Sequence, residues 1–480
     1  MASRVEKVSK YICIIVSIIG LQSIAIYDGQ WCRNQNGLKN ANKCKLIEKA
    51  KLNYPASFLI ENYTNLRKVL SSKTTSGMVV LNLNESRKRF KDSKSGFTFN
   101  YPKGSRDKAG YILMAHGDSN KDGEPLLELW DLNEQELIYK WNLNMNEINN
   151  YLRASSNQDI EISNSVVFSN PLILNDGNII TTKDNGFLIK LSPDGKVNQI
   201  NSDYFFHHSL EIDKQGYIYS PIRIPPKNQG EFPDEGFAIL DQELNILKSF
   251  SLSKIFQDSG LNYKIYSKNP TLDPFHLNDV APLLNEEKSN VVLLSLRSMS
   301  SIIAFNIDTE KIIWKIEGYF NRQHDVDILD NKGSHITIFD NNIEKGYYTN
   351  GNNFITIKNL ESSTKNDSEE MFIYSYPSRK AIDKELIIKK EDFSFLEANL
   401  IPITEKGGQS EYIIDNNSVF IEETNNGRSF EYDVETKKIL WQYINRDDSN
   451  NLYYQMSWAR RIKDLPPSLL EDIKKAVNPN

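Results

Sequence analysis

Cysteine, clustered positive charge and histidine are all scarce in this chain of 480 residues, and each scarcity limits the functions that the protein can have. There are only three cysteines and no Cys-x-x-Cys pair, which excludes a cysteine-based metal site. The net charge is −6 and no stripe of Lys or Arg is present, which argues against binding to nucleic acid. There are only six histidines, so the places where they fall carry information.

The N-terminal residues predict export. Basic residues within positions 1–10 precede an uncharged apolar run at 11–27. That order places residues 1–10 in the cytoplasm, and the run reaches the short limit for a membrane-spanning helix. We therefore expect a single-pass anchor in the inner (cytoplasmic) membrane, with the body of the protein facing the periplasm or exterior. A cleaved signal peptide ending near Ser23-Ile24-Ala25 and a buried core helix are the alternatives.

Residues 28–105 are expected to form an exported N-terminal region that is partly helical over 45–72. Cys13 lies inside the apolar run, whereas Cys32 and Cys44 follow it. An oxidising compartment would allow the latter two to form a disulfide that closes a small loop. Two unpaired thiols are the alternative.

The body of the chain repeats one hairpin pattern, in which an apolar alternating strand and a polar turn precede a second strand that often ends in Trp. The copies cover 126–143, 187–200, 237–252, 302–318 and 430–443, with a weaker copy at 371–391. A second pattern, two strands around a turn, precedes several of these copies. It covers 171–182, 210–221, 280–297 and 326–340.

About four strands per unit, repeated six times, predict an all-β protein with a six-bladed β-propeller over residues 106–445. Prolines at the start of an amphipathic stretch predict a short flanking helix over 465–477, inside a C-terminal segment at 446–480. A β-sandwich or two stacked β domains is the structural alternative. Neither would explain why the same hairpin recurs.

Three histidines stand at the start of a repeat unit. His208, His276 and His324 each lie just before the first strand of a predicted blade, and such strands line the central channel of a propeller. We therefore expect these histidines, together with His207, to converge at one site. The competing interpretation is that each one is a turn residue or a hydrogen-bonded core residue.

Other polar residues join this group. Asn278 lies two residues after His276, and Arg297 ends an apolar strand of the same predicted blade. A charge in so apolar a segment needs a partner or a role, and a structural ion pair is the alternative to a functional site. We expect His116 to be a turn residue and His335 an ordinary strand residue, both outside the site.

These residues fall in short blocks that resemble the bacterial arylsulfotransferases, a family of six-bladed β-propellers. The blocks are FHH at 206–208, HLN at 276–278, LLSLRSMSSIIAF at 293–305 and QHDVDI…GSHITIFDN at 323–341, with a further segment at 420–433. The chain departs from the family at Ser209, where an acidic residue commonly follows the histidines. It also departs at Asn342, which replaces a usual glycine.

The resemblance implies roles for individual residues. His324 aligns with the nucleophilic histidine of the family. Further active-site positions align with His276, Asn278, Arg297, His208 or alternatively His207, and Ser457 as a candidate hydroxyl residue. The implied activity is PAPS-independent transfer of a sulfuryl group from an aryl sulfate donor to a phenolic acceptor.

The residue types suit that chemistry. A neutral imidazole such as His324 can attack sulfur and form a sulfohistidine, which splits one difficult step into two. A second histidine such as His208 can move the proton, and Arg297 can stabilise the negative charge on the transferred group. No step needs a metal or another cofactor.

Two other functions remain open at this level. The first is a non-catalytic envelope propeller that binds a small molecule, a sugar or a protein partner. The second is a metal-dependent or quinone-dependent propeller enzyme. The sequence disfavours the second, because it shows no convergent acidic set of clear spacing and no vicinal cysteine pair.

Overall fold

The structure is a computed structural model that describes one compact part of the chain, within Ser76–Asn480. The described residues are 90, 93–118, 124–155, 168–224, 234–261, 273–283, 290–330, 333–343, 352–358, 360, 372–375, 383–388, 402–404, 407–448 and 452–477. The predicted cytoplasmic end, membrane anchor, N-terminal helical stretch and all three cysteines lie outside them. Within the described residues, no helix combines the length and apolar character that crossing a membrane requires.

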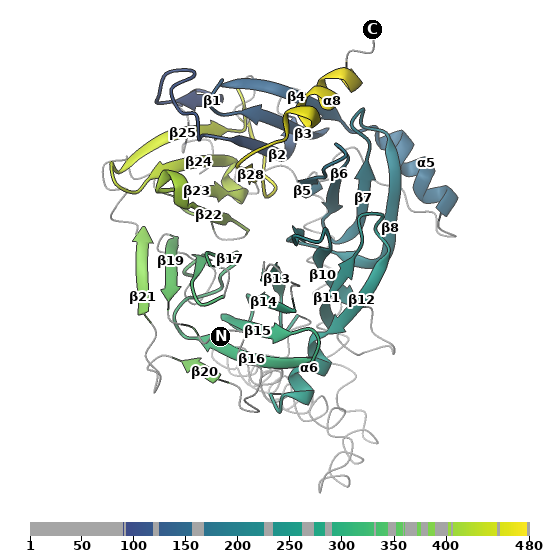
Figure 1. The fold of residues 1–480 in the computed structure, drawn as a ribbon, viewed down its shortest axis with the longest axis vertical. Coiled ribbons are helices and arrows are strands. Elements are labelled where there is room, and N and C mark those ends of the chain that lie inside the picture. Colours follow the sequence, from purple (N-terminus) through teal and green to yellow (C-terminus); the bar gives the residue numbers. More distant parts are fainter. Residues whose placement is uncertain are drawn as a thin grey trace, which may run out of the picture. The chain divides into compact units, whose positions relative to one another are not determined.

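Antiparallel sheets of four or more strands dominate the described chain (Figure 1). One sheet contains β28 (Arg460–Ile462), β2 (Tyr111–Asp118), β3 (Glu124–Asp131) and β4 (Glu136–Asn142), in that order. An eight-stranded sheet contains β5 (Phe168–Ile173), β6 (Ile179–Lys183), β7 (Gly186–Leu191), β8 (Val197–Phe206), β9 (Glu211–Ile212), β10 (Ile218–Ile224), β11 (Asp234–Leu240) and β12 (Ile246–Ser251). Its two halves, β5 to β8 and β9 to β12, are joined only by a short pairing of β8 with β10.

Three more sheets follow along the chain. The next contains β13 (Leu277–Pro282), β14 (Val291–Leu296), β15 (Ser301–Asn306), β16 (Lys311–Glu317) and β20 (Phe372–Ser375). Another contains β17 (Val326–Ile328), β18 (Ile336–Asp340), β19 (Asn353–Lys358) and β21 (Asp383–Ile388). The last contains β22 (Gln409–Ile413), β23 (Ser418–Glu423), β24 (Arg428–Asp433), β25 (Lys438–Ile444) and β1 (Gly96–Phe99).

Short elements complete the described chain. The helices are α5 (Met145–Ser155), α6 (Leu252–Asp258) and α8 (Pro467–Val477), with the 3₁₀ turns η3 (Ile414–Asn416) and η4 (Thr424–Asn426). The strands β26 (Arg446–Asp447) and β27 (Leu452–Tyr453) form a small ribbon. Helix α8 confirms the helix that the sequence predicted near the C-terminus.

The sequence repeat is also a structural repeat. In each sheet the two outer strands of the meander pair with a register shift that skips one residue of the outermost strand, as between Ala304 and Phe305. Such bulges increase the local twist of a strand pair, and strongly twisted sheets can stand around a common axis. The Trp residues that marked the predicted hairpins, Trp141, Trp314 and Trp441, are almost completely buried.

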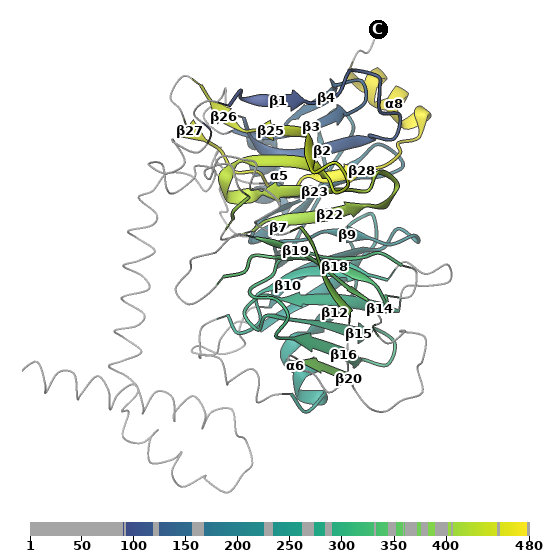
Figure 2. The ribbon, with the colours of Figure 1, turned by 90° about the vertical axis from the view of Figure 1, so that its left-hand side faces the viewer.

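One predicted hairpin is wrong. Residues 371–391 contain β20 and β21, but these two strands do not pair with each other. Strand β21 completes its own sheet beside β19 (Figure 1). Strand β20 instead pairs in parallel with β16 at the outer edge of the preceding sheet (Figure 2). Alternating hydrophobicity alone does not tell which strand a segment will pair with.

The sheets surround a common centre, with β5, β13, β17, β22 and β28 innermost, which is the arrangement of a β-propeller (Figure 1). Both ends of the described chain close the ring. Strand β28 pairs with β2 in the first sheet, and β1 pairs with β25 in the last. Both strands lie beyond the range 106–445 that the sequence predicted for the propeller. Each end thereby covers a strand edge that would otherwise be exposed.

The apolar core lies between neighbouring sheets. Phe237 and Phe250 of one sheet pack against Phe305 of the next, with ring centroids 6.0 and 5.3 Å apart.

Candidate functional site

Imidazoles from three sheets meet where the inner strands begin. The ring centroid of His208 lies 5.1 Å from that of His276 and 6.2 Å from that of His324. His208 and His276 have positive φ angles of 56° and 51°, which non-glycine residues rarely adopt. This backbone conformation turns each side chain out of the strand direction, and strain of this kind is concentrated at functional sites. The predicted convergence of these three histidines is present in the structure.

Hydrogen bonds between sheets define which positions are equivalent. The Val280 backbone N–H donates to Ser209 Oγ (3.1 Å), the Val326 N–H to Asp279 Oδ2 (3.1 Å), and the Ser410 N–H to an oxygen of Asp325 (2.8 Å). The same contact thus recurs three times between neighbouring sheets, and we call it the inter-sheet latch.

The latch corrects the predicted register of the histidines. It makes Ser209, Asp279 and Asp325 equivalent, so the residues before them, His208, Asn278 and His324, are equivalent too. His276 precedes this position by two residues and reaches the cluster because of its left-handed backbone. Ser209 stands where the resembling family commonly has an acidic residue. In this structure its hydroxyl accepts the latch hydrogen bond that a carboxylate accepts at Asp279 and Asp325.

The ring of His324 is held from both sides. Nδ1 lies 2.6 Å from Asn341 Oδ1, and the Gly407 backbone N–H donates to Nε2 over 3.0 Å. Because the Gly407 N–H can only donate, Nε2 is the unprotonated nitrogen and Nδ1–H donates to Asn341. Burial lowers the pKa of His324 well below its usual value, and the positive charge of Arg297 lowers it further. His324 is therefore neutral at physiological pH.

Only one histidine of the adjacent pair faces the cluster. His208 contacts His276 and His324, whereas His207 is completely buried behind it, with the two Nδ1 atoms 2.8 Å apart. Burial lowers the pKa of His208 to about 4, and His276 and Arg297 also lower it against the opposing effect of Asp184. The sequence favoured His208 by its position in the repeat and kept His207 as the alternative, and His208 is the one whose ring lies beside His276 and His324.

Three further predicted residues border the cluster. His276 Nδ1 is hydrogen-bonded to Asp273. Burial acts to raise the pKa of Asp273, but this hydrogen bond and the charges of His276, Arg223 and His207 together lower it to about 2. Arg297 follows β14, and its backbone N–H donates to the His276 carbonyl over 3.0 Å. Asn278 is buried, and its amide donates to the Gln323 carbonyl over 3.1 Å, just before His324. Its contact thus holds the backbone immediately before His324.

The remaining candidates lie outside the cluster. Ser457 is buried, and its backbone bridges Ala115 and Asn170. Asn170 in turn donates to the His208 carbonyl, so Ser457 is connected to the cluster only indirectly. His335 immediately precedes β18.

The expectation for His116 was wrong. It is not a turn residue, because it lies inside β2. Its side chain is buried, with Nδ1 3.0 Å from the Gly117 carbonyl and Nε2 3.4 Å from Glu128.

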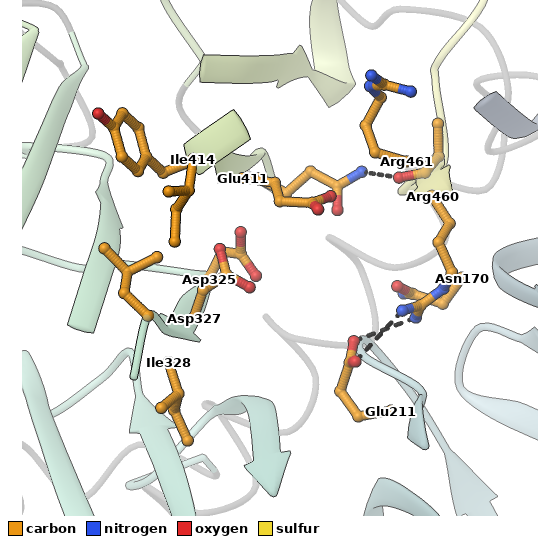
Figure 3. A pocket seen from close by; sticks show the side chains of 13 residues that line it. Asn170, Glu211, Asp325, Asp327, Ile328, Glu411, Ile414, Arg460 and Arg461 are labelled. Carbon is orange, nitrogen blue, oxygen red and sulfur yellow. Dashed lines mark hydrogen bonds and ion pairs between the residues drawn. The ribbon is translucent and has the colours of Figure 1, made fainter. Parts of the chain in front are cut away.

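The central channel contains a second polar feature, a cavity of about 280 Å³ (Figure 3). Carboxylates line it from several inner strands, and Arg460 forms an ion pair with Glu211 at one side. Burial raises the pKa of Glu411 to about 7 and those of Asp325 and Asp327 well above their usual value. A convergent acidic set therefore exists, contrary to the sequence-based expectation. Among the described residues, however, no three His, Cys, Asp or Glu side chains are arranged to hold a metal ion.

Several residues of the site were not singled out from the sequence. Asn341 and Asp273 orient the His324 and His276 rings, and Gly407 covers Nε2 of His324. Asn341 stood inside a quoted block, and Asp273 precedes His276 by three residues, so local signals for both existed. Gly407 has no such signal, because only folding places it beside His324.

The fold and the site define a class of molecule, a β-propeller whose inner loops surround a cluster of histidines with an arginine. No curated protein matches the chain. The β-propeller domain of Cps50 (Swd1) from Myceliophteria thermophila is 10% identical, covers 72% of this chain and 86% of its own, and has a TM-score of 0.38. The C-terminal WD40 domain of Sif2 is 9% identical, with coverage of 77% and 88% and a TM-score of 0.34.

One family model matches a larger and more specific part of the sequence. The model described as arylsulfotransferase (ASST) covers residues 175–446, which is more than half of the chain. The chain belongs to the arylsulfotransferase family, a family of transferases. The matched range includes the histidine cluster and Arg297.

Proposed function

We propose that this protein transfers a sulfuryl group from an aryl sulfate to a phenolic acceptor without PAPS, through a covalent intermediate on His324. The observation that carries the proposal is the convergence of three imidazoles beside Arg297, with the His324 ring fixed by Asn341. Membership of the arylsulfotransferase family supports the reaction class. We also propose that the repeated meanders form six blades, with the eight-stranded sheet supplying two of them.

In the first half-reaction, the lone pair on Nε2 of His324 attacks sulfur. The N–S bond forms, the S–O bond to the aryl group breaks, and the departing aryloxide takes a proton from His208. Since the Gly407 N–H occupies Nε2 in this structure, that hydrogen bond must open first. The released N–H can then donate to a sulfuryl oxygen.

In the second half-reaction, the acceptor phenol gives its proton to His208 and its oxygen attacks sulfur. The N–S bond breaks and His324 returns to its neutral form. Arg297 is the fixed positive charge for the three sulfuryl oxygens in both steps, and removal of such a donor typically costs about 10²–10³ in rate.

The test compares the full chain with His324→Asn on a chromogenic aryl sulfate, with and without a phenol acceptor and without added metal. We expect acceptor-dependent release of the chromophore that the substitution abolishes. His335→Asn is the matched control, since His335 precedes a strand of the same sheet outside the cluster, and we expect it to keep full activity. Release by His324→Asn at the wild-type rate would reject His324 as the nucleophile.

The alternative is ligand binding without chemistry, and the channel cavity is the observation that favours it. It predicts that neither protein releases the chromophore, while a small-molecule or sugar ligand raises the Tm of both equally.

We further propose that residues 11–27 anchor the protein in the inner membrane with the propeller facing the periplasm or exterior. This proposal rests on the charge pattern of the N-terminal sequence. Separation of membrane and soluble fractions, followed by protease treatment of spheroplasts, tests it: recovery of intact protein in the cytosolic fraction would reject it.

A further inference from the structure

Two buried polar atoms face each other behind the histidine cluster. His207 Nε2 and Glu235 Oε1 lie 3.9 Å apart, and both side chains are about 1% exposed. Within the described part of the chain, neither atom has a hydrogen-bond partner. A buried polar atom without a partner destabilises the folded state, so an arrangement of this kind needs an explanation.

Other groups hold Glu235 in place. Its second oxygen, Oε2, accepts a hydrogen bond from the Leu277 backbone N–H over 2.9 Å. Arg223 lies 3.5 Å from Oε1 and 3.9 Å from Asp273, and the Asp273 side chain also interacts directly with Glu235. Burial raises the pKa of Glu235 to about 8, and the negative charge of Asp273 adds to this effect against Leu277 and Arg223. The carboxyl can therefore hold or release a proton near neutral pH.

We propose that Glu235 is a positioning residue that decides, through His207, which ring nitrogen of His208 carries the proton. The 2.8 Å contact between the two Nδ1 atoms allows only one of them to be protonated. A protonated Glu235 donates to His207 Nε2, so His207 donates from Nδ1 and His208 holds its proton on Nε2. An ionised Glu235 accepts from His207 Nε2, so His208 donates from Nδ1 and its Nε2 is free to accept a proton.

The two states match the two halves of the proposed sulfuryl transfer, on which this inference rests. When the aryloxide takes the proton from His208 Nε2, the His207 Nδ1 proton moves to His208 Nδ1, and the Glu235 proton moves to His207 Nε2. The acceptor phenol later returns one proton and reverses each transfer. His208 thus changes from acid to base with no net gain or loss of protons over the cycle.

The kinetic test uses Glu235→Gln. The amide oxygen can still accept from Leu277, while its NH₂ donates permanently to His207 and fixes His208 in the acid form. With a donor whose aryloxide leaves as the anion, we expect the burst of one phenol per site to remain within a few-fold of wild type, because no proton transfer is needed. Steady-state turnover with a weakly acidic phenol falls about 10²–10⁴-fold, because His208 cannot become the base. An acceptor that is already ionised at the assay pH restores turnover, because it needs no base.

Glu422→Gln is the matched control. Glu422 is equally buried and accepts from the Trp458 and Ala459 backbone N–H groups, but it faces no histidine. Glu422→Gln shows how much activity is lost when any buried carboxylate becomes an amide. We expect the ratio of the burst rate to the steady-state rate to equal that of the wild type. If Glu235→Gln slows both half-reactions equally with every acceptor, the relay is wrong.

A second measurement does not depend on activity. Nitrogen-15 NMR of labelled histidines in the full chain distinguishes the two tautomers of His208. We expect a switch with a midpoint near pH 8 in the wild type and none in Glu235→Gln. Identical His208 signals in both proteins would overturn the inference even if sulfuryl transfer occurs. Absence of the burst in wild type would instead reject the proposed function, and the NMR result would still decide the relay.

Discussion

The neutral state of His324 depends on its immediate surroundings. Burial and the nearby Arg297 charge both disfavour the imidazolium, while the contact with Asn341 acts in the opposite direction. The same Arg297 charge lowers the pKa of His208. One guanidinium therefore affects both histidines, which are the nucleophile and the proton-transfer residue in the proposed mechanism.

Replacing Arg297 separates these effects. Without its charge, the pKa of His324 rises towards 6.5, so less of the ring is neutral at pH 5–6. We expect Arg297→Gln to lower kcat about 10²–10³-fold and to move the acid limb of kcat/KM to higher pH. Arg297→Lys keeps the positive charge but loses the planar set of guanidinium donors. We therefore expect kcat to fall while the acid limb of kcat/KM stays at the wild-type pH. Equal acid limbs in Gln and wild-type proteins would contradict this account.

At the scale of the elements, neighbouring sheets are tied together beside the site. The inter-sheet latch joins a side chain at the start of one inner strand to a backbone N–H of the next sheet. Its members directly follow His208, Asn278 and His324. The latch that stabilises the ring thus also holds the functional positions in a common register.

Asp279 offers a direct test of the latch. Asp279→Ala leaves the buried Val326 N–H without its acceptor, and we expect a loss of about 1–3 kcal/mol in the free energy of unfolding. Asp279→Asn retains a carbonyl oxygen and should remain close to wild type. Urea denaturation at pH 7 measures the difference. Equal losses in both variants would show that the charge of Asp279, rather than the hydrogen bond, stabilises the contact.

At the scale of the whole molecule, closure of the ring depends on the C-terminal strand. Arg461 of β28 donates to the Ala109 and Tyr111 carbonyls beside β2 and forms an ion pair with Glu431 in the last sheet. This one side chain therefore spans the point where the ring closes. The acidic channel lies inside the closed ring. The protonation of its carboxyl groups is therefore coupled to the free energy of unfolding.

The channel makes stability depend on pH. Burial raises the pKa of Asp279 and Glu411 to about 7, whereas both are near 4 in an unfolded chain. The folded state therefore loses protons between pH 6.5 and 8 while the unfolded state does not, and we expect the free energy of unfolding to fall by about 1 kcal/mol per group. His207 and His324, with lowered pKa values, destabilise the fold only as the pH falls below 6.5.

Urea titrations at several pH values across this window measure the slope. Glu411→Gln removes one titrating group, so the free energy of unfolding should fall by about 1 kcal/mol less than in the wild type over this pH range. Stability that stays constant or rises from pH 6.5 to 8 in the wild type would contradict the assigned protonation states.

The sequence by itself determined the repeating hairpins, the propeller class and the three histidines that converge, because alternation and turn residues are local signals that each unit repeats. Position in the repeat led to His208, His276 and His324, although the latch shows that His276 lies two residues before the equivalent position, which Asn278 occupies. The quoted blocks identified Arg297. The weaker copy at 371–391 misled because pairing partners are not encoded in alternation.

Only the tertiary structure decided the rest. Closure by β1 and β28, the choice of His208 over His207, and the contacts of Asn341 and Gly407 with His324 join residues that are distant in sequence or differ only in orientation. The acidic channel and the pairing of His207 with Glu235 likewise arise between strands of different segments. Burial sets these protonation states, and burial exists only once the sheets have packed around their common centre.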